Sequence, residues 1–341
     1  MKALQLLGSA KDGGAETYFL SLVEALQAGG LPQACAIRTH RAREQRLAAA
    51  DIPASVLRFG GLLDLSTKGR VKRFAKAQGA GALIAWMNRA ARFAPGGPWG
   101  RIGRLGGYYG LKYYRGFDHL VANTRDIERW IVRQGWPAAK VRYIPNFAAP
   151  GVGEPVDRSL HDTPADAPLL LSMGRLHANK GHDVSLRALA ELPDAYLWIA
   201  GSGPLEDELK TLALQLGVSG RVRFLGWRQD AASLYRTADV CLFPSRFEPL
   251  GNVVIQAWAH GRPVVAAMSD GPAALIRPEA DGLLTPINDA RALALAARRL
   301  ILDPGLRRRL AEAGSARLAA EFSPGRVIAD WRDLLQPYGV G

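Results

Sequence analysis

The chain has 341 residues, 48% hydrophobic and 22% charged, which is typical of a soluble globular protein large enough for two domains. No apolar run approaches the roughly 18 residues that indicate a transmembrane helix, and the N-terminal stretch lacks the apolar core of a signal peptide. Cys35 and Cys241 lie in separate apolar runs, and we expect both to be buried free thiols.

The net charge of +13 is concentrated in the first half of the chain. Residues 1–150 contain 23 Lys and Arg against 9 Asp and Glu, whereas residues 151–341 contain 21 against 22. The segments 41–46 and 68–76 mix cations with apolar residues at helical spacing. This pattern favours a polyanionic partner, namely an anionic membrane surface, a phosphorylated glycolipid or nucleic acid. A basic surface with no partner is the simpler alternative.

Short apolar runs alternate with helical patterns along the whole chain, which predicts parallel sheets built from strand–helix units. The predicted strands are near residues 3–7, 33–37, 55–58, 82–86, 119–122, 141–143, 169–173, 197–200, 222–225, 240–243, 264–267 and 283–285. In the first half, helices are expected to begin near Gly14, Arg41, Ser66, Gly106 and Thr124.

Residues 148–168 are dense in Pro, Gly and Asp and show no periodicity, which is typical of a linker. The sequence therefore predicts two Rossmann-like domains, at 1–147 and 169–322, with a terminal helix in 323–341.

The most informative stretch runs from Asp239 to Gly261. An apolar strand ends at Pro244, a polar loop carries Glu248, and a helical pattern follows from Leu250. Such a loop lies at the carboxyl edge of the sheet, where open α/β sheets bind ligands, and Gly251 would let an anion approach the helix. A carboxylate beside an anion site suggests a ligand with both hydroxyls and negative charge, such as a nucleotide sugar.

A second loop, Gly174 to Gly181, follows the first strand of the second domain and contains Arg175 and Lys180. The planar fork of an arginine and the mobile charge of a lysine can together hold two phosphate groups. These contacts would strengthen as a diphosphate leaves and its charge grows. Two solvated surface cations are the simpler interpretation.

Together these motifs resemble the retaining glycosyltransferases of family 4, also called group 1 glycosyl transferases, which have the GT-B fold. GRLHANKG matches the family's G-R-x4-K-G pattern, and Glu248 matches the first glutamate of its donor signature. The resemblance implies two Rossmann-like domains facing across a cleft, with Arg175, Lys180 and Glu248 as catalytic residues. It also implies donor contacts from the following residues: Gly13, Gly14, Gly174, Leu225, Leu250, Gly251, Asn252 and Gln256.

The chain departs from the family pattern at two places. Gln256 stands where relatives have a second glutamate that binds the ribose, and an amide can still bond a diol, although less strongly than a carboxylate. No histidine stands where many relatives have one near the donor sugar, so Asn88 or Arg89 is expected to take over those contacts. Tyr108 and Tyr109 suit stacking against an acceptor sugar, with core packing as the equal alternative.

The expected function is transfer of a sugar from a UDP- or GDP-sugar to a saccharide or anionic glycolipid of the cell envelope, such as a lipopolysaccharide core. Because no Asp-x-Asp or metal-ligand spacing occurs, no metal or other cofactor is expected. The enzyme should be cytoplasmic and peripheral on the inner membrane. A GT-B epimerase or phosphorylase and, less favoured, a nucleic-acid-binding protein are the alternatives, although no nucleic-acid-binding motif occurs.

Overall fold

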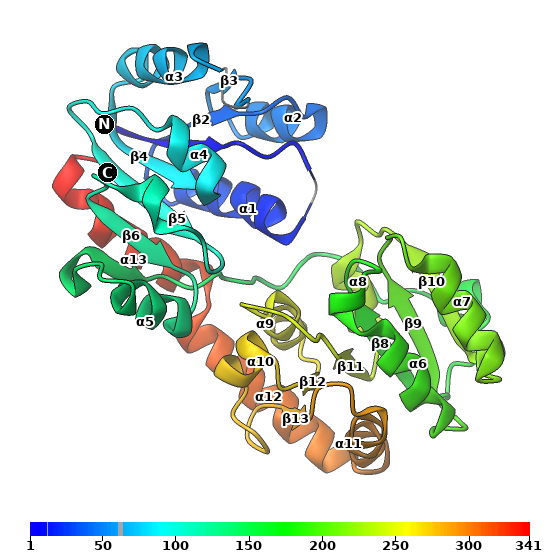
Figure 1. Ribbon diagram of the computed structural model, residues 1–341. Helices are drawn as coiled ribbons and strands as arrows, with labels where there is room; N and C mark the ends of the chain where they lie inside the picture. The colour runs from blue at the N-terminus through cyan, green and yellow to red at the C-terminus, as the bar shows by residue number, and fades with distance from the viewer. Residues whose placement is uncertain (12, 61–63) are drawn as a thin grey trace. The chain divides into compact units, whose positions relative to one another are not determined.

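The computed structural model describes residues 1–11, 13–60 and 64–341, which form two α/β units (Figure 1). One unit contains residues 1–146 together with 324–341, and the other contains residues 147–323. Within the described residues, no helix is long and apolar enough to cross a membrane.

The first unit is built on a seven-stranded parallel sheet with the order β3-β2-β1-β4-β5-β6-β7. Its strands are β1 Lys2–Leu7, β2 Gln33–Ile37, β3 Ala54–Val56, β4 Ala80–Trp86, β5 Gly100–Leu105, β6 His119–Ala122 and β7 Val141–Tyr143. The strand order reverses between β1 and β4, which makes this pair the topological switch point where open α/β sheets bind ligands.

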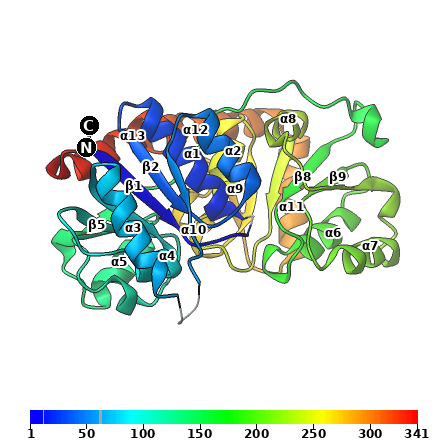
Figure 2. The ribbon, with the colours of Figure 1, turned by 90° about the horizontal axis from the view of Figure 1, so that it is seen from above.

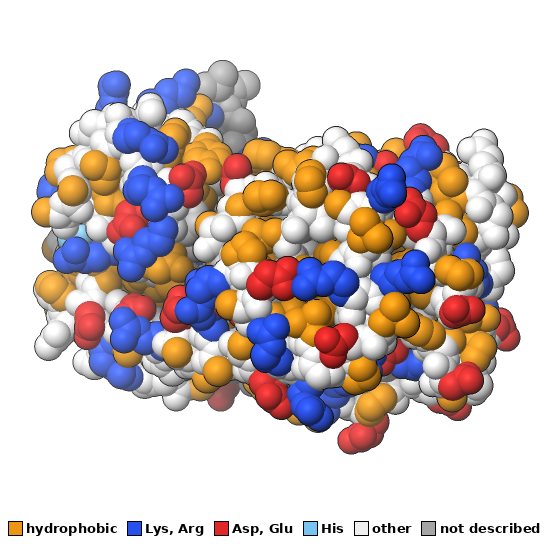
Figure 3. Space-filling model, turned by 90° about the horizontal axis from the view of Figure 1, so that it is seen from below, with side chains coloured by type: hydrophobic (Ala, Val, Ile, Leu, Met, Phe, Trp, Pro, Cys, Tyr) orange, Lys and Arg blue, Asp and Glu red, His pale blue; other side chains and the backbone are white. Residues whose placement is uncertain are grey.

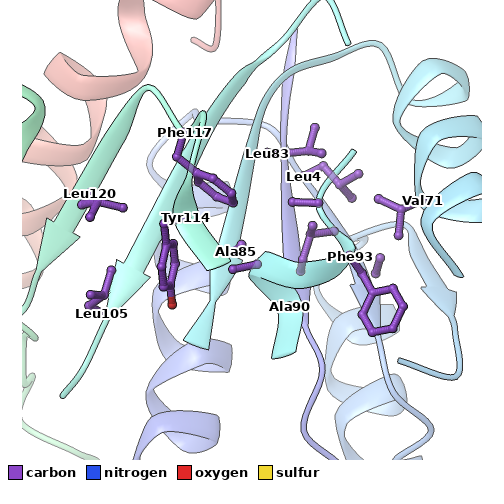
Figure 4. Packing of buried hydrophobic residues seen from close by; sticks show 14 of the residues in the cluster. Leu4, Val71, Leu83, Ala85, Ala90, Phe93, Leu105, Tyr114, Phe117 and Leu120 are labelled. Carbon is purple, nitrogen blue, oxygen red and sulfur yellow. The ribbon is translucent and has the colours of Figure 1, made fainter. Parts of the chain in front are cut away.

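Helices cover both faces of the first sheet (Figure 2). They are α1 Gly14–Ala28, α2 Arg41–Ala49, α3 Ser66–Ala77, α4 Met87–Phe93, α5 Arg125–Arg133 and α13 Pro324–Leu335. On one face, Val71 of α3 and Phe93 of α4 pack with strand residues such as Leu4, Leu83 and Leu120 in one buried cluster (Figure 4). On the other face, α13 lies against α1, so the C-terminal helix is part of the first unit.

The second unit repeats this topology with a six-stranded parallel sheet in the order β10-β9-β8-β11-β12-β13. Its strands are β8 Leu169–Met173, β9 Tyr196–Ala200, β10 Val222–Gly226, β11 Val240–Phe243, β12 Val264–Ala267 and β13 Leu283–Thr285. Its helices are α6 His182–Ala190, α7 Glu206–Gln215, α8 Ala231–Thr237, α9 Asn252–Ala259, α10 Asp270–Leu275, α11 Ala290–Leu302 and α12 Pro304–Glu321. The switch point here lies between β8 and β11.

The second core also has two faces. Residues of α6, α7 and α11 pack on one side of the sheet, and residues of α8 and α9 pack on the other. Cys241 lies in the second of these clusters, and both it and Cys35 are buried free thiols, as expected. Burial raises the pKa of Cys241 to about 12, so this thiol is unreactive at neutral pH.

The Pro- and Gly-rich stretch 147–168 is anchored on the second unit. Arg158 donates hydrogen bonds to the Thr237 carbonyl and the Asp239 carboxylate, and the Gly151 amide donates to Nε2 of His260. A short 3₁₀ turn, Arg158–His161, interrupts it. The stretch is therefore ordered by side-chain contacts although its sequence has no periodicity.

Two local predictions are wrong. Residues 100–105 form the buried strand β5, where no strand is predicted, and the helix expected near Gly106 is instead a 3₁₀ turn over Leu111–Tyr114. Asn88 and Arg89 lie in the first turn of α4.

Candidate functional site

The predicted donor residues of the second domain gather at the carboxyl edge of the second sheet, at its switch point. The loop after β8 carries Arg175 and Lys180, and the loop after the adjacent strand β11 carries Glu248. Two loops far apart in sequence therefore meet where the strand order reverses.

Lys180 and Glu248 form an ion pair that joins these two loops. Both side chains are partly buried, with exposed fractions of 27% and 15%. The other carboxylate oxygen of Glu248 accepts a hydrogen bond from the Gly251 amide at 3.3 Å. A β-carbon at Gly174 would lie 3.6 Å from Cδ of Lys180, so the lysine stem runs alongside that glycine. The arrangement fixes a positive and a negative group at one site.

The amino end of α9 lies next to this pair. Gly251 precedes the helix with φ +87°, a left-handed conformation that favours glycine, and no side chain caps the helix at this end. Leu250 is buried, and Asn252 opens the first turn. The backbone N–H groups and the helix dipole favour an anion at such a terminus.

Arg175 and Leu225 occupy the same sheet edge without joining the ion pair. The Arg175 side chain is exposed and forms no hydrogen bond or ion pair within the described residues, so its fork is available to a ligand. Leu225 is half-buried near the end of β10, two strands from β8.

Gln256 lies on α9 beside a buried phenol. The hydroxyl of Tyr235 donates to Oε1 of Gln256 at 3.2 Å, and the ring of Tyr235 stacks on His260 with centroids 5.2 Å apart. Burial raises the pKa of Tyr235, so the phenol stays a donor. The amide oxygen of Gln256 is thereby engaged, which leaves its N–H₂ group as the part that can meet a ligand.

Two residues that hold these loops are absent from the sequence predictions. Arg246 forms two hydrogen bonds with the Asp183 carboxylate, at 2.8 and 2.6 Å, and a third with the Ala178 carbonyl. His182 is buried, with its ring nitrogens 3.0 Å from the Ser172 hydroxyl and 3.3 Å from the Gly174 carbonyl. Only the adjacency of His182 to Lys180-Gly181 could have drawn attention to it in the sequence.

The predicted residues of the first domain gather at the carboxyl edge of the first sheet. Gly13 caps α1, and Gly14 begins it. Arg89 packs on Gly8, since a β-carbon there would lie 2.9 Å from the arginine stem. Asn88 is half-buried, and its side-chain oxygen has no hydrogen-bond partner.

The two predicted acceptor tyrosines lie in different surroundings. The Tyr108 hydroxyl bonds the Asp126 carboxylate, and its ring meets Trp130 of α5 edge-on at 5.5 Å. Burial raises the pKa of Tyr109, the Glu16 carboxylate raises it further, and Arg104 opposes them. Tyr109 therefore lies near both a carboxylate and a guanidinium at the sheet edge, whereas Tyr108 packs against α5.

His119 stands at the start of β6, so it does not lie at the carboxyl edge of the first sheet. It lines a hollow of about 360 Å³ with Arg142, Asp330 and Leu334. Within the described residues, no three His, Cys, Asp or Glu side chains are grouped so as to hold a metal ion.

Comparison with known proteins identifies the family of the chain. The family described as "Glycosyl transferases group 1" matches residues 155–317. The chain is 40% identical to the lipopolysaccharide core biosynthesis glycosyltransferase LpsE of Rhizobium meliloti (strain 1021), covering 95% of this chain and 96% of that protein. It is 36% identical to LpsD of the same organism, with 95% of each chain covered.

Solved structures show the same fold. Anabaena Alr3699/HepE in complex with UDP matches with a TM-score of 0.86 at 21% identity, covering 99% of this chain and 100% of that chain. WaaG, a glycosyltransferase involved in lipopolysaccharide biosynthesis, matches with a TM-score of 0.70 at 18% identity, covering 96% and 98%. The chain therefore belongs to the group 1 glycosyl transferases and is a glycosyltransferase with the GT-B fold.

Proposed function

We propose that the enzyme transfers a sugar, with retention at the anomeric carbon as in family 4, from a nucleoside-diphosphate sugar to a saccharide or glycolipid acceptor of the lipopolysaccharide core. The observation that carries this proposal is the Lys180–Glu248 pair at the β8/β11 switch point, beside the amino end of α9. It supplies a cation and a hydroxyl-binding carboxylate at one place. LpsE and LpsD, by their names, act in lipopolysaccharide core biosynthesis, and this supports the acceptor class.

The residue roles follow from the chemistry of the side chains. Arg175 and Lys180 hold the diphosphate, whose growing charge on departure strengthens both contacts. Glu248 binds hydroxyls of the donor sugar, and Gln256 binds the ribose. Gly174, Gly251 and Leu250 shape the donor pocket, and Leu225 adjoins the base.

The donor is a UDP- or GDP-sugar, and transfer needs no metal ion, because two cationic side chains and a helix terminus supply the positive charge. The HepE structures contain UDP, UDP-glucose, or UDP with glucose, which favours UDP. Activity should survive EDTA, and loss on chelation that Mg²⁺ or Mn²⁺ restores would contradict this part of the proposal.

Residues 1–147 bind the acceptor, residues 169–322 bind the donor, residues 148–168 link them, and residues 323–341 return to the first domain. Asn88, Arg89, Tyr108 and Tyr109 are the acceptor-side residues, of which Tyr109 has the more suitable surroundings. Gly13 and Gly14 allow a ligand to approach the start of α1 closely.

The enzyme works in the cytoplasm, on the inner face of the cytoplasmic membrane, where such a glycolipid is accessible. The exposed cations of α3 support this location. Basic and acidic side chains are interspersed on the face shown in Figure 3, so the excess positive charge does not form one continuous patch there.

The test is isothermal titration of the protein with UDP- and GDP-sugars, followed by nucleotide release with and without lipopolysaccharide core acceptor. We expect a UDP-sugar to bind and UDP to be released only when the acceptor is present. Acceptor-independent conversion of the donor would indicate an epimerase, and sugar release dependent on phosphate would indicate a phosphorylase. Failure of every nucleotide sugar to bind would refute the donor assignment.

A further inference from the structure

The guanidinium of Arg104, near the end of β5, is buried without a carboxylate. The residue is 2% exposed, and its charge lies over the rings of Tyr18 and Trp86, with Cζ 5.5 and 5.2 Å from their centroids. Nη2 donates to the side-chain oxygen of Asn146, whereas Nε and Nη1 are buried without a hydrogen-bond partner. No Asp or Glu of the described residues forms an ion pair with it.

Arg43 provides a contrast within the same unit. It is also 2% exposed, but its Nη1 and Nη2 donate to the carbonyls of Ser9 and Lys11 at 2.8 and 3.2 Å. Its burial is explained by the loop that it holds. The unused donors of Arg104 have no such explanation.

A buried charge without a counter-charge destabilises the folded state. Burial lowers the pKa of Arg104, and the neighbouring Tyr18 side chain partly opposes this, yet an arginine stays protonated in proteins, so the positive charge remains. Buried donors without partners are rare in native proteins and occur at functional sites. The site around Arg104 is therefore suited to a negative group brought by a ligand.

Other unusual features lie at the same sheet edge. Leu7, Trp86, Arg104 and Val121 are in register across β1, β4, β5 and β6, so the residues that follow them share one edge. Met87 has φ +62°, which a non-glycine residue adopts only at a cost. The side-chain oxygens of Asn88 and Asn123 are buried without partners.

We propose that Arg104, with Tyr109 near it, forms an oxyanion-binding site at the carboxyl edge of the first sheet, and that this site takes a phosphate or carboxylate group of a substrate. The proposal rests on the proposed function for the identity of that substrate. The group comes from the acceptor, as a phosphate or as the carboxylate of an anionic sugar.

The experiment compares the full-length wild type with Arg104→Met and with a control, Arg101→Met. Arg101 lies on the same strand but near its start, where it bonds the Gly116 carbonyl. Thermal unfolding is measured with inorganic phosphate, glucuronate and glucose, and binding of UDP and uridine is measured by titration. Without ligand, Arg104→Met should unfold at the same or a higher temperature than the wild type, because it removes an uncompensated buried charge.

We expect phosphate to raise the unfolding temperature of the wild type and of Arg101→Met more than that of Arg104→Met, which keeps only the phosphate site at Arg175 and Lys180. A tenfold or greater loss of UDP affinity in Arg104→Met, with unchanged uridine binding, would overturn the acceptor as the source of the group. Unchanged UDP affinity together with loss of the glucuronate or phosphate effect would assign it to the acceptor.

Equal stabilisation of the wild type and Arg104→Met by phosphate, with equal UDP affinity, would overturn the proposal. If the Met variant does not fold, Arg104→Gln serves instead, because it removes the charge but can still bond Asn146, and undiminished phosphate binding by this variant would likewise overturn the site. The phosphate measurement is independent of the proposed function. Failure of the wild type to bind any nucleotide would refute the donor assignment alone.

Discussion

Lys180 and Glu248 are 68 residues apart in the sequence, and their ion pair places the cation of one predicted motif against the carboxylate of the other. A ligand phosphate at Lys180 would compete with Glu248 for the ammonium, while the Gly251 amide keeps one carboxylate oxygen in place. Binding of a diphosphate would therefore change the partner of Glu248 as well as that of Lys180.

Replacing Arg175 or Lys180 by Ala should lower kcat/KM by about ten- to a hundredfold, because each lost charge-assisted bond is worth about 1.5–3 kcal/mol. Lys210→Ala is a matched control, since Lys210 is an exposed lysine of α7 that pairs with Glu206. Steady-state kinetics on all three variants test this. Unchanged kinetics in both Arg175→Ala and Lys180→Ala would remove the diphosphate assignment.

Gln256→Glu should tighten nucleotide-sugar binding, because a carboxylate bonds a ribose diol more strongly than an amide does. The Tyr235 hydroxyl can donate to the new carboxylate as it does to the amide, so the fold should be retained. Titration of wild type and variant with the same donor measures the change. Weaker or unaltered binding would show that this face of α9 does not meet the ribose.

His182 gives the protein a pH-dependent stability. Burial lowers its pKa to about 4, with its neutral ring between Ser172 and the Gly174 carbonyl. The unfolded state therefore binds more protons between pH about 6.5 and about 4, and the free energy of unfolding should fall by roughly 3 kcal/mol as pH drops through that window. Denaturant unfolding at several pH values should show this decline.

The matched variant for this effect is His182→Gln, which cannot bind a proton. Its stability should depend less on pH between 6.5 and 4, although some dependence should remain because the pKa values of His119 and His260 are also lowered. An identical pH profile in wild type and variant would mean that His182 is not the group responsible.

Among the helices and strands, those strands that consist of a continuous apolar run could be predicted from the sequence. Strand β5, which has no such run, could not. β11 and β12 read Val240–Phe243 and Val264–Ala267, and both have the predicted limits. β5 contains two glycines and two arginines, residues with little preference for a buried strand.

Tertiary packing explains the composition of β5. A β-carbon at Gly103 would lie 2.5 Å from the ring of Tyr114, and one at Gly100 would lie 2.2 Å from the ring of Tyr338. The neighbouring aromatic rings therefore require glycines in this strand. Such a requirement depends on residues 11 and 238 positions away, and no local pattern can reveal it.

The residues of the candidate site also fall into two groups, those that the sequence predicts and those that only the fold reveals. Glycine, cation and carboxylate motifs at strand ends revealed Lys180, Glu248 and Gly251, because parallel strands bring their carboxyl ends to one edge. The positions of Arg104 and His182 became apparent only in the fold, since one belongs to an unpredicted strand and the other is defined by its buried partners.

At the scale of the whole molecule, the positive charge of residues 1–150 should direct the enzyme to anionic membranes. Lys68, Arg70, Lys72, Arg73 and Lys76 are exposed on α3, and Leu65 before it is 88% exposed, while Val71 and Ala75 hold the helix to the core. Each Lys or Arg at such a surface contributes about 1 kcal/mol, so five engaged together would suffice for peripheral binding.

Co-sedimentation with vesicles of anionic or neutral lipid tests this attraction at low and high salt. Binding should be confined to anionic vesicles and should fade with salt, as the Debye length falls from about 10 Å at 0.1 M to about 3 Å at 1 M. Neutralising the five α3 cations together should abolish binding. Neutralising Arg291, Arg298 and Arg308, exposed arginines of the second unit, should not.

Equal binding to both vesicle types, or to neither, would mean that the cations of the first unit do not recognise the membrane and instead bind the phosphates of the acceptor itself. The variant with all five α3 cations neutralised would then still lose transfer to the glycolipid while binding the nucleotide sugar normally. Removal of these exposed cations leaves the buried contacts of Val71 and Ala75 intact, so the variant should keep its fold. If it also keeps both glycolipid transfer and nucleotide-sugar binding, the cations of α3 have no role in the function.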